Sequence, residues 1–185
     1  MTSRRSLDPK RLDVATLAAE AGSLTGDWPL SALPRLAEAQ VRPIGPGPLA
    51  DIRWQANGSR AVLQGAGMQP ALHLVAETTA TLECQRCLHP MAWPLHAERT
   101  IFFIEGEDAA AALDAEVEDD VLALAPAIDL RSLIEDELLL ALPIVPRHDV
   151  CPEPLVAPPD DPETSVEKEN PFAILAALKR GGRPT

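Results

Sequence analysis

Aromatic residues are scarce in this sequence, whose 185 residues include three Trp, three Phe and no Tyr. Without several aromatic side chains the chain lacks the stacking platform on which many RNA-binding domains place unpaired bases. Positive charge is also scarce, because Lys and Arg total 16 against 28 Asp and Glu, for a formal net charge of -12. The composition therefore disfavours coating of nucleic acid or an anionic membrane through a generally basic surface.

Cysteine is limited to three residues, an odd number that argues against a disulfide framework. The N-terminus carries charges with no apolar stretch after them, so we expect no secretory signal. The longest charge-free stretch, residues 61–76, contains Gly, Pro, Gln and His and is too short to span a bilayer. These features predict a cytoplasmic protein with no membrane segment, in a reducing compartment.

The length is close to one average domain. The sequence predicts a single α+β domain: an antiparallel β-sheet meander with one packed amphipathic helix and short peripheral helices. We expect an N-terminal helical segment with a Pro/Gly connector, an α+β core, an acidic flexible linker and a C-terminal helix, over residues 1–48, 49–157, 158–169 and 170–181.

Period-two hydrophobicity predicts the strands of the core. We expect strands at 52–56 and 60–64, joined by a hairpin turn at Asn57-Gly58. Longer strands are expected at 72–84 and 93–104, with 121–125 as a possible fifth. The acidic segment 105–120 is interpreted as a solvated loop.

Helical spacing and capping residues predict the helices. Short helices are expected at 13–21 and 34–40, and the clearest helix at 129–142, where Asp129 is the N-cap and Pro143 ends the helix. Glu137 falls within the apolar stripe of that helix, whereas Glu135 and Asp136 point away.

One group of residues has the spacing of metal ligands. Cys84 and Cys87 form a Cys-x-x-Cys turn, and His148 and Cys151 follow the clearest helix. Together they make a Cys3His set of the kind that holds structural zinc, with His89 as a rival ligand. The alternative is a pair of half-buried thiols. A redox pair is disfavoured, because its thiolate is usually stabilised at a helix N-terminus and here the pair lies in a hairpin turn.

Catalytic motifs are otherwise absent: no phosphate-binding Gly-rich loop, no G-x-S-x-G and no H-E-x-x-H. His73 and His96 fall on outward strand faces and are interpreted as solvated.

Four pieces of the sequence, in this order, resemble the YceD family of bacterial proteins, which has plastid relatives. They are Thr81-Leu82-Glu83-Cys84-Gln85-Arg86-Cys87, the helix Asp129-Leu130 through Glu135-Asp136-Glu137 to Pro143, the pair His148 and Cys151, and Asn170-Pro171-Phe172-Ala173 to Leu178-Lys179-Arg180. The resemblance covers about residues 72–181. It implies a non-enzymatic ribosome-biogenesis factor that supports synthesis, processing or stability of large-subunit 23S rRNA.

The resemblance implies a 23S rRNA precursor or a large-subunit ribosomal protein as partner. Two alternatives stay open. One is a small zinc-dependent hydrolase with Cys84, Cys87 and Cys151 as ligands, an open fourth position and Glu137 as general base. The other is an acidic adaptor that binds a basic ribosomal protein without touching RNA.

The resemblance also brings Arg86 and Glu137 together as motif members, and we expect them to form a buried pair that ties the helix to the Cys turn. Basic residues gather at the two termini, which are the candidate contacts to RNA or a partner: Arg4, Arg5, Lys10, Arg11, Lys179, Arg180 and Arg183.

Overall fold

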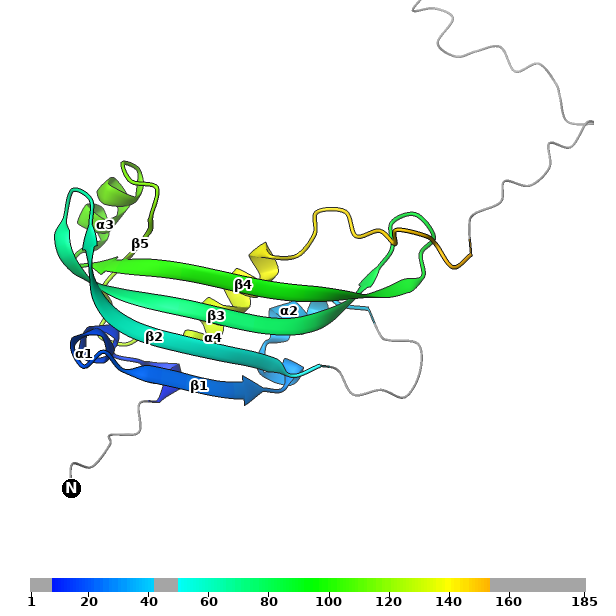
Figure 1. Cartoon of the computed structure of the whole chain (residues 1–185), viewed down its shortest axis with the longest axis horizontal. Helices are drawn as coiled ribbons and strands as arrows, with labels where there is room; N and C mark the ends of the chain where they lie inside the picture. The colour runs from blue at the N-terminus through cyan, green and yellow to red at the C-terminus, as the bar shows by residue number, and fades with distance from the viewer. Residues whose placement is uncertain (1–7, 42–49, 154–185) are drawn as a thin grey trace, which may run out of the picture. The chain divides into compact units, whose positions relative to one another are not determined.

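The computed structural model describes residues 8–41 and 50–153 (Figure 1). The strands are β1 (Ser23–Trp28), β2 (Ile52–Leu63), β3 (Gly67–Glu83), β4 (Pro90–Ile104) and β5 (Asp120–Ala123). The helices are α1 (Val14–Ala19), α2 (Pro34–Glu38), α3 (Glu107–Asp114) and α4 (Leu130–Leu140), with single 3-10 turns η1 (Pro9–Arg11) and η2 (Leu30–Ala32). The connector expected at 43–48, the acidic linker and the C-terminal helix at 170–181 lie outside the described residues.

The strands form one sheet in the order β1-β2-β3-β4-β5. The first four pair antiparallel, and β5 pairs parallel with the last residues of β4. Two parallel strands need a crossover connection between them, and α3 lies in the connection from β4 to β5. The acidic segment 105–120 was expected to be a loop throughout, so this helix corrects that expectation. The α+β class predicted from the sequence is confirmed, as is the fifth strand.

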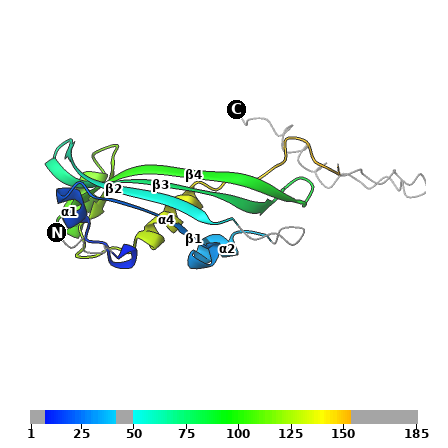
Figure 2. The ribbon, with the colours of Figure 1, turned by 60° about the horizontal axis from the view of Figure 1, so that its bottom comes forward.

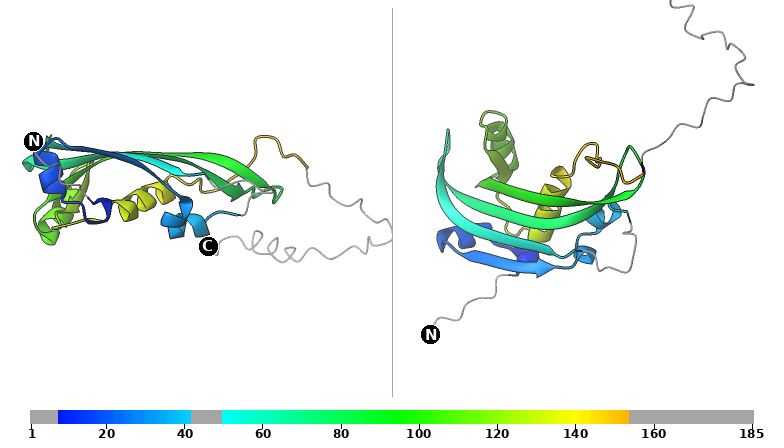
Figure 3. Two further views of the ribbon diagram at one scale, coloured as in Figure 1. Left: turned by 90° about the horizontal axis from the view of Figure 1, so that it is seen from below. Right: turned by 45° about the vertical axis from the view of Figure 1, so that its right-hand side comes forward.

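One face of the sheet carries the helices and the core. Figures 2 and 3 show α1, α2 and α4 on the same side of the sheet. Trp54, Ala76 and Ala97 are aligned across β2, β3 and β4 on that face, and all three are buried. The stripe of α4 that packs against them consists of Leu130, Ile134 and Leu138, spaced four residues apart as one helix face requires, and each is fully buried.

The hairpin expected at Asn57-Gly58 is wrong, because β2 continues through both residues. Gly58 instead allows α1 to pack closely on β2, because a Cβ at this position would lie 2.6 Å from the main-chain carbonyl carbon of Leu17 on α1. The chain turns after Leu63, where Gly65 and Gly67 have φ values of 84° and 73°. Such left-handed backbone is open to glycine at little cost.

The N-terminal segment was expected to be helical, and β1 was not foreseen. Its side chains alternate only between exposed and half-buried, which is typical of an edge strand with a weak pattern. Gly26 leaves room for the Trp54 ring, because a Cβ there would lie 2.9 Å from that ring. The helices expected at 13–21 and 34–40 are present as α1 and α2. In the part of the chain described, no helix is both long and apolar enough to cross a membrane.

Candidate metal centre

The Cys-x-x-Cys turn connects β3 to β4. The Cys84 N–H donates to the carbonyl of His89 at 3.0 Å, and the Leu88 N–H donates to the carbonyl of Cys84 at 2.8 Å. Leu88 has a φ of 60°, an unusual conformation for a leucine. The main chain is thus folded tightly around the two thiols, and both cysteines are buried.

The segment after α4 is attached to this turn through the main chain. The Gln85 N–H donates to the carbonyl of Pro146 at 2.9 Å. Arg86 reaches across as well, because its Nη2 donates to the carbonyls of His148 and Asp149 at 3.2 and 3.3 Å. These contacts bring together two segments more than sixty residues apart in the sequence and place His148 and Cys151 beside the cysteine pair.

The four predicted ligand atoms converge. One donor atom from each of Cys84, Cys87, His148 and Cys151 lies within 4.8 Å of all the others. The Sγ atoms of Cys84 and Cys151 are 3.9 Å apart, and the Cys87 Sγ is 3.4 Å from the His148 Nδ1. A tetrahedral zinc ion with bonds of ~2.3 Å to sulfur separates two sulfurs by about 3.8 Å. The donor set and its spacing therefore fit a Cys3His zinc site.

The electrostatics of the cluster differ from one thiol to the next. Burial alone would raise the pKa of Cys84, but hydrogen bonds from the main-chain N–H groups of His148, Cys87 and Arg86 outweigh it and lower the pKa to about 5. Burial raises the pKa of Cys87. The Arg86 Nε donates to the Cys151 Sγ at 3.0 Å, which places a positive charge beside the third thiol. The main-chain donors around the Cys84 sulfur thus favour its thiolate, the form that binds metal.

The predicted pair between Arg86 and Glu137 is not formed. Arg86 is engaged by Cys151 and the His148 loop, whereas the Glu137 carboxylate lies 3.1 Å from the Arg99 Nε. The inward orientation of Glu137 was correct, since its side chain is only 14% exposed. Glu137 pairs with Arg99 and not with Arg86 because Arg99 lies beside α4, on the face of β4 that packs against this helix.

Glu135 is a position on α4 whose burial the sequence pattern did not predict. It was expected to point away from the core, yet it is buried, and its carboxylate accepts the N–H groups of Arg35 and Leu36 at 2.6 and 3.1 Å. The helical periodicity of α4 does not indicate the burial of Glu135, because its partner is the start of α2, one hundred residues earlier.

The remaining histidines are engaged elsewhere. The His89 Nδ1 lies 3.0 Å from the carbonyl of Cys87, and His89 is not part of the converging donor group. His73 and His96 lie on the open face of the sheet as expected, where each contacts a glutamate, Glu98 and Glu77 respectively.

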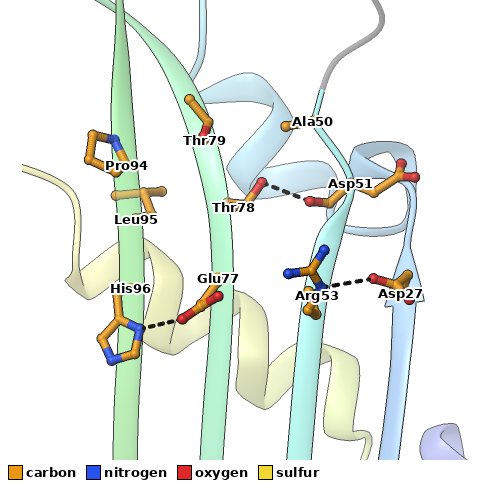
Figure 4. Close-up of a pocket in the computed structure, with 10 residues that line it drawn as sticks. All are labelled: Asp27, Ala50, Asp51, Arg53, Glu77, Thr78, Thr79, Pro94, Leu95 and His96. Carbon is orange, nitrogen blue, oxygen red and sulfur yellow. Dashed lines mark hydrogen bonds and ion pairs between the residues drawn. The ribbon is translucent and has the colours of Figure 1, made fainter.

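A hollow of about 510 Å³ is lined by residues of β1, β2, β3 and β4 and of the segment just before β2 (Figure 4). Its charged side chains already contact one another. Arg53 lies 3.7 Å from Asp27, and His96 lies 3.2 Å from Glu77. This internal pairing makes the hollow a weaker candidate than the Cys3His cluster.

Of the terminal basic residues, Lys10 and Arg11 lie in η1, where the Lys10 N–H donates to the Asp8 carboxylate at 3.0 Å. The others, Arg4, Arg5, Lys179, Arg180 and Arg183, lie outside the described residues.

Residues 72–179 match the family described as large ribosomal RNA subunit accumulation protein YceD. The chain belongs to the YceD family. This confirms the resemblance seen in the sequence. The matched residues include all four donors of the Cys3His cluster and leave out α1, β1, α2 and β2.

A curated relative in this family is the large ribosomal RNA subunit accumulation protein YceD of Haemophilus influenzae, to which the chain is 39% identical over 103 residues. The alignment covers 54% of this chain and 59% of that relative, so the chain spans less than two thirds of the relative's length. No solved structure matches this YceD-family chain.

Proposed function

We propose that this YceD-family chain is a non-enzymatic ribosome-biogenesis factor that supports the accumulation of large-subunit 23S rRNA. The observation that carries the proposal is family membership over residues 72–179, together with a curated relative named for accumulation of large ribosomal subunit RNA. The partner is a 23S rRNA precursor or a large-subunit ribosomal protein, in the cytoplasm.

We further propose that the Cys3His cluster holds one zinc ion in a structural role. A structural zinc site has four protein ligands, whereas a catalytic site keeps one position for water or substrate. Here four protein donors converge, so that they would supply all four ligands of a bound ion. Zinc would neutralise the cluster's thiolates and tie the β3–β4 turn to the segment after α4.

This arrangement favours the structural reading over the zinc-dependent hydrolase. The hydrolase needs an open coordination position and a general base beside the metal. His148, whose Nδ1 lies 3.4 Å from the Cys87 Sγ, would fill the fourth position. Glu137, the candidate base, is instead paired with Arg99.

Depletion of the chain in the cells that encode it tests the function. Precursor and mature 23S and 16S rRNA would be quantified by sequencing total RNA at intervals after depletion. We expect the ratio of 23S to 16S rRNA to fall, and to recover on expression of the wild-type chain. An unchanged ratio after complete depletion would contradict the proposal.

Elemental analysis tests the zinc site. Protein purified without a histidine tag should contain one zinc per chain, and removal of the ion by a chelator should lower the melting temperature. Cys84→Ser should reduce the zinc content, whereas Glu83→Gln, a neighbouring exposed change, should not. Metal-free wild-type protein whose melting is unaffected by chelator would end the zinc proposal.

A further inference from the structure

The strand β4 has an edge that is only partly used. β5 pairs with Ile101–Ile104, the last four residues of β4. Over residues 90–100 of β4, no second strand pairs on that side within the described part of the chain. Pro94 in this stretch is typical of an edge strand, since proline cannot donate to a further strand. After Pro94, residues 95–100 therefore form a short edge that no strand of the described residues covers, directly before the part of β4 that pairs with β5. We call it the free edge.

Two hollows border this free edge, and Glu137 lines both. One, of about 280 Å³, lies between α4, β5 and the end of α3, and the other, of about 220 Å³, lies between α4 and residues 96–99 of β4. We call them together the edge groove. Its apolar part includes Ile101, Val121 and Leu133.

The charged part of the edge groove is acidic. Asp114, Asp120, Asp136 and Glu137 line the first hollow, and Glu137 also lines the second. Among the described residues that line the two hollows, Arg99 is the one Lys or Arg. A negatively lined hollow attracts a cation and repels phosphate.

Arg99 shows what this lining can hold. Its guanidinium lies between two carboxylates, with Nε 3.1 Å from Glu137 and Nη1 3.9 Å from Asp120. The longer contact leaves Asp120, which is 58% exposed, available to a second basic side chain. The groove thus already accommodates one guanidinium, and its more distant carboxylate, Asp120, is exposed to a second basic group.

We propose that the edge groove binds an extended, Lys/Arg-rich segment of a partner protein, which adds to the free edge of β4. Main-chain hydrogen bonds to residues 95–100 would supply affinity, and alternate side chains would enter the groove. Basic side chains would meet Asp120 and its neighbours, while Leu122 and Leu140, which are 44% and 73% exposed, would contact apolar ones. This inference rests on the proposed function and specifies its partner as a basic protein.

The probe is a fluorescein-labelled nine-residue peptide of alternating arginine and valine, titrated with the full chain. We expect binding that weakens about tenfold in Asp120→Lys, because a groove carboxylate is replaced by a charge of the same sign as the peptide's arginines. Leu140→Lys, at the other hollow, should also weaken binding. Glu118→Lys is the matched control: it makes the same charge change within the same acidic segment, outside the groove lining, and should change affinity less than about twofold.

Hydrogen exchange identifies the bound surface. The peptide should slow exchange of main-chain N–H groups within residues 95–100, whereas a peptide of alternating glutamate and valine should not. Equal weakening by Asp120→Lys and Glu118→Lys, unprotected amides at 95–100, or no binding of the basic peptide would each overturn the proposal. Protection of the same amides by a 23S rRNA fragment and not by the peptide would assign the groove to RNA, and would also overturn it.

The rRNA measurement separates this inference from the proposed function. If depletion lowers the 23S to 16S ratio and Asp120→Lys restores it as well as the wild-type chain does, the groove proposal fails and the function stands. If depletion leaves the ratio unchanged, the function itself fails.

Discussion

The carboxylate of Glu135 caps the N-terminus of α2, where it contacts Arg35, one hundred residues earlier in the chain. One oxygen accepts the Arg35 N–H at 2.6 Å and the Leu36 N–H at 3.1 Å, while the other lies 2.9 Å from the Arg35 Nε. No side chain at the α2 N-cap position makes a capping hydrogen bond. Glu135 thus supplies from α4 the acceptor that the N-terminus of α2 lacks.

Removal of this carboxylate should be costly, because it leaves main-chain donors and a cation without their partner. We expect Glu135→Ala to lower the free energy of unfolding by about 3–5 kcal/mol, measured by chemical denaturation. The control is Asp136→Ala, which removes an exposed carboxylate that also contacts Arg35. This substitution should lower the free energy of unfolding by less than about 1 kcal/mol. Equal effects of the two substitutions would show that the cap contributes little.

The partner of Glu137 can be measured with double-mutant cycles. The structure pairs it with Arg99, so Arg99→Ala and Glu137→Ala should show a coupling energy of about 1 kcal/mol. The same cycle with Arg86→Ala should give a coupling within error of zero. Coupling to Arg86 instead of Arg99 would restore the pairing expected from the sequence and contradict the contact in the structure.

Gly58 tests the packing of α1 on β2. A Cβ at this position would lie 2.6 to 2.7 Å from main-chain and side-chain atoms of Leu17. We therefore expect Gly58→Ala to destabilise the fold by about 1–3 kcal/mol, since either the helix or the strand must shift. Ser59→Ala, at the exposed neighbouring position, should have little effect. A Gly58→Ala protein as stable as wild type would mean that α1 does not approach β2 so closely.

Asp13 provides a test that depends on pH. Asp13 caps α1 by accepting hydrogen bonds from the Thr16 N–H at 3.0 Å and from the Thr16 hydroxyl at 2.7 Å. Both hydrogen bonds lower the pKa of Asp13 below the ordinary 3.8, and the one from the N–H has the larger effect. A lowered carboxyl pKa stabilises the fold above the unfolded-state pKa, and this contribution is lost as pH falls through the folded-state pKa.

Asp13→Ala should accordingly cost about 1 kcal/mol at neutral pH and progressively less as the pH falls below 3.8. Asp13→Asn keeps a capping acceptor that does not titrate, so its stability relative to Asp13→Ala should not change over that range. A deficit of Asp13→Ala that stays constant into acid would rule out the ionised cap.

The sequence was informative wherever one face of an element is strongly buried. The alternation along β3 and β4 and the stripe of α4 predicted the sheet and its main helix, because burial on one side imposes a period on the residues. The convergence of Cys84, Cys87, His148 and Cys151 was also predicted, since Cys-x-x-Cys and His-x-x-Cys are local spacings and each pair follows a regular element.

The errors came from contacts between distant segments. Gly58 resembles a turn residue locally, but its role is set by Leu17 on a helix that packs above it. Glu135 lies off the apolar stripe of α4, and its burial depends on where α2 begins. The hydrophobic periodicity of a single segment does not reveal contacts with a distant one. The sequence therefore paired Glu137 with Arg86 and did not identify Arg99.

The most direct test of the account links the Cys3His cluster to rRNA. In depleted cells, the 23S to 16S rRNA ratio would be compared after rescue by the wild-type chain, by Cys84→Ser with Cys87→Ser, and by Glu83→Gln as control, at matched protein levels. The account predicts recovery with the wild-type chain and the control, and a ratio as low as in unrescued cells with the double cysteine variant. Full recovery with the double variant, or no fall in the ratio on depletion, would contradict it.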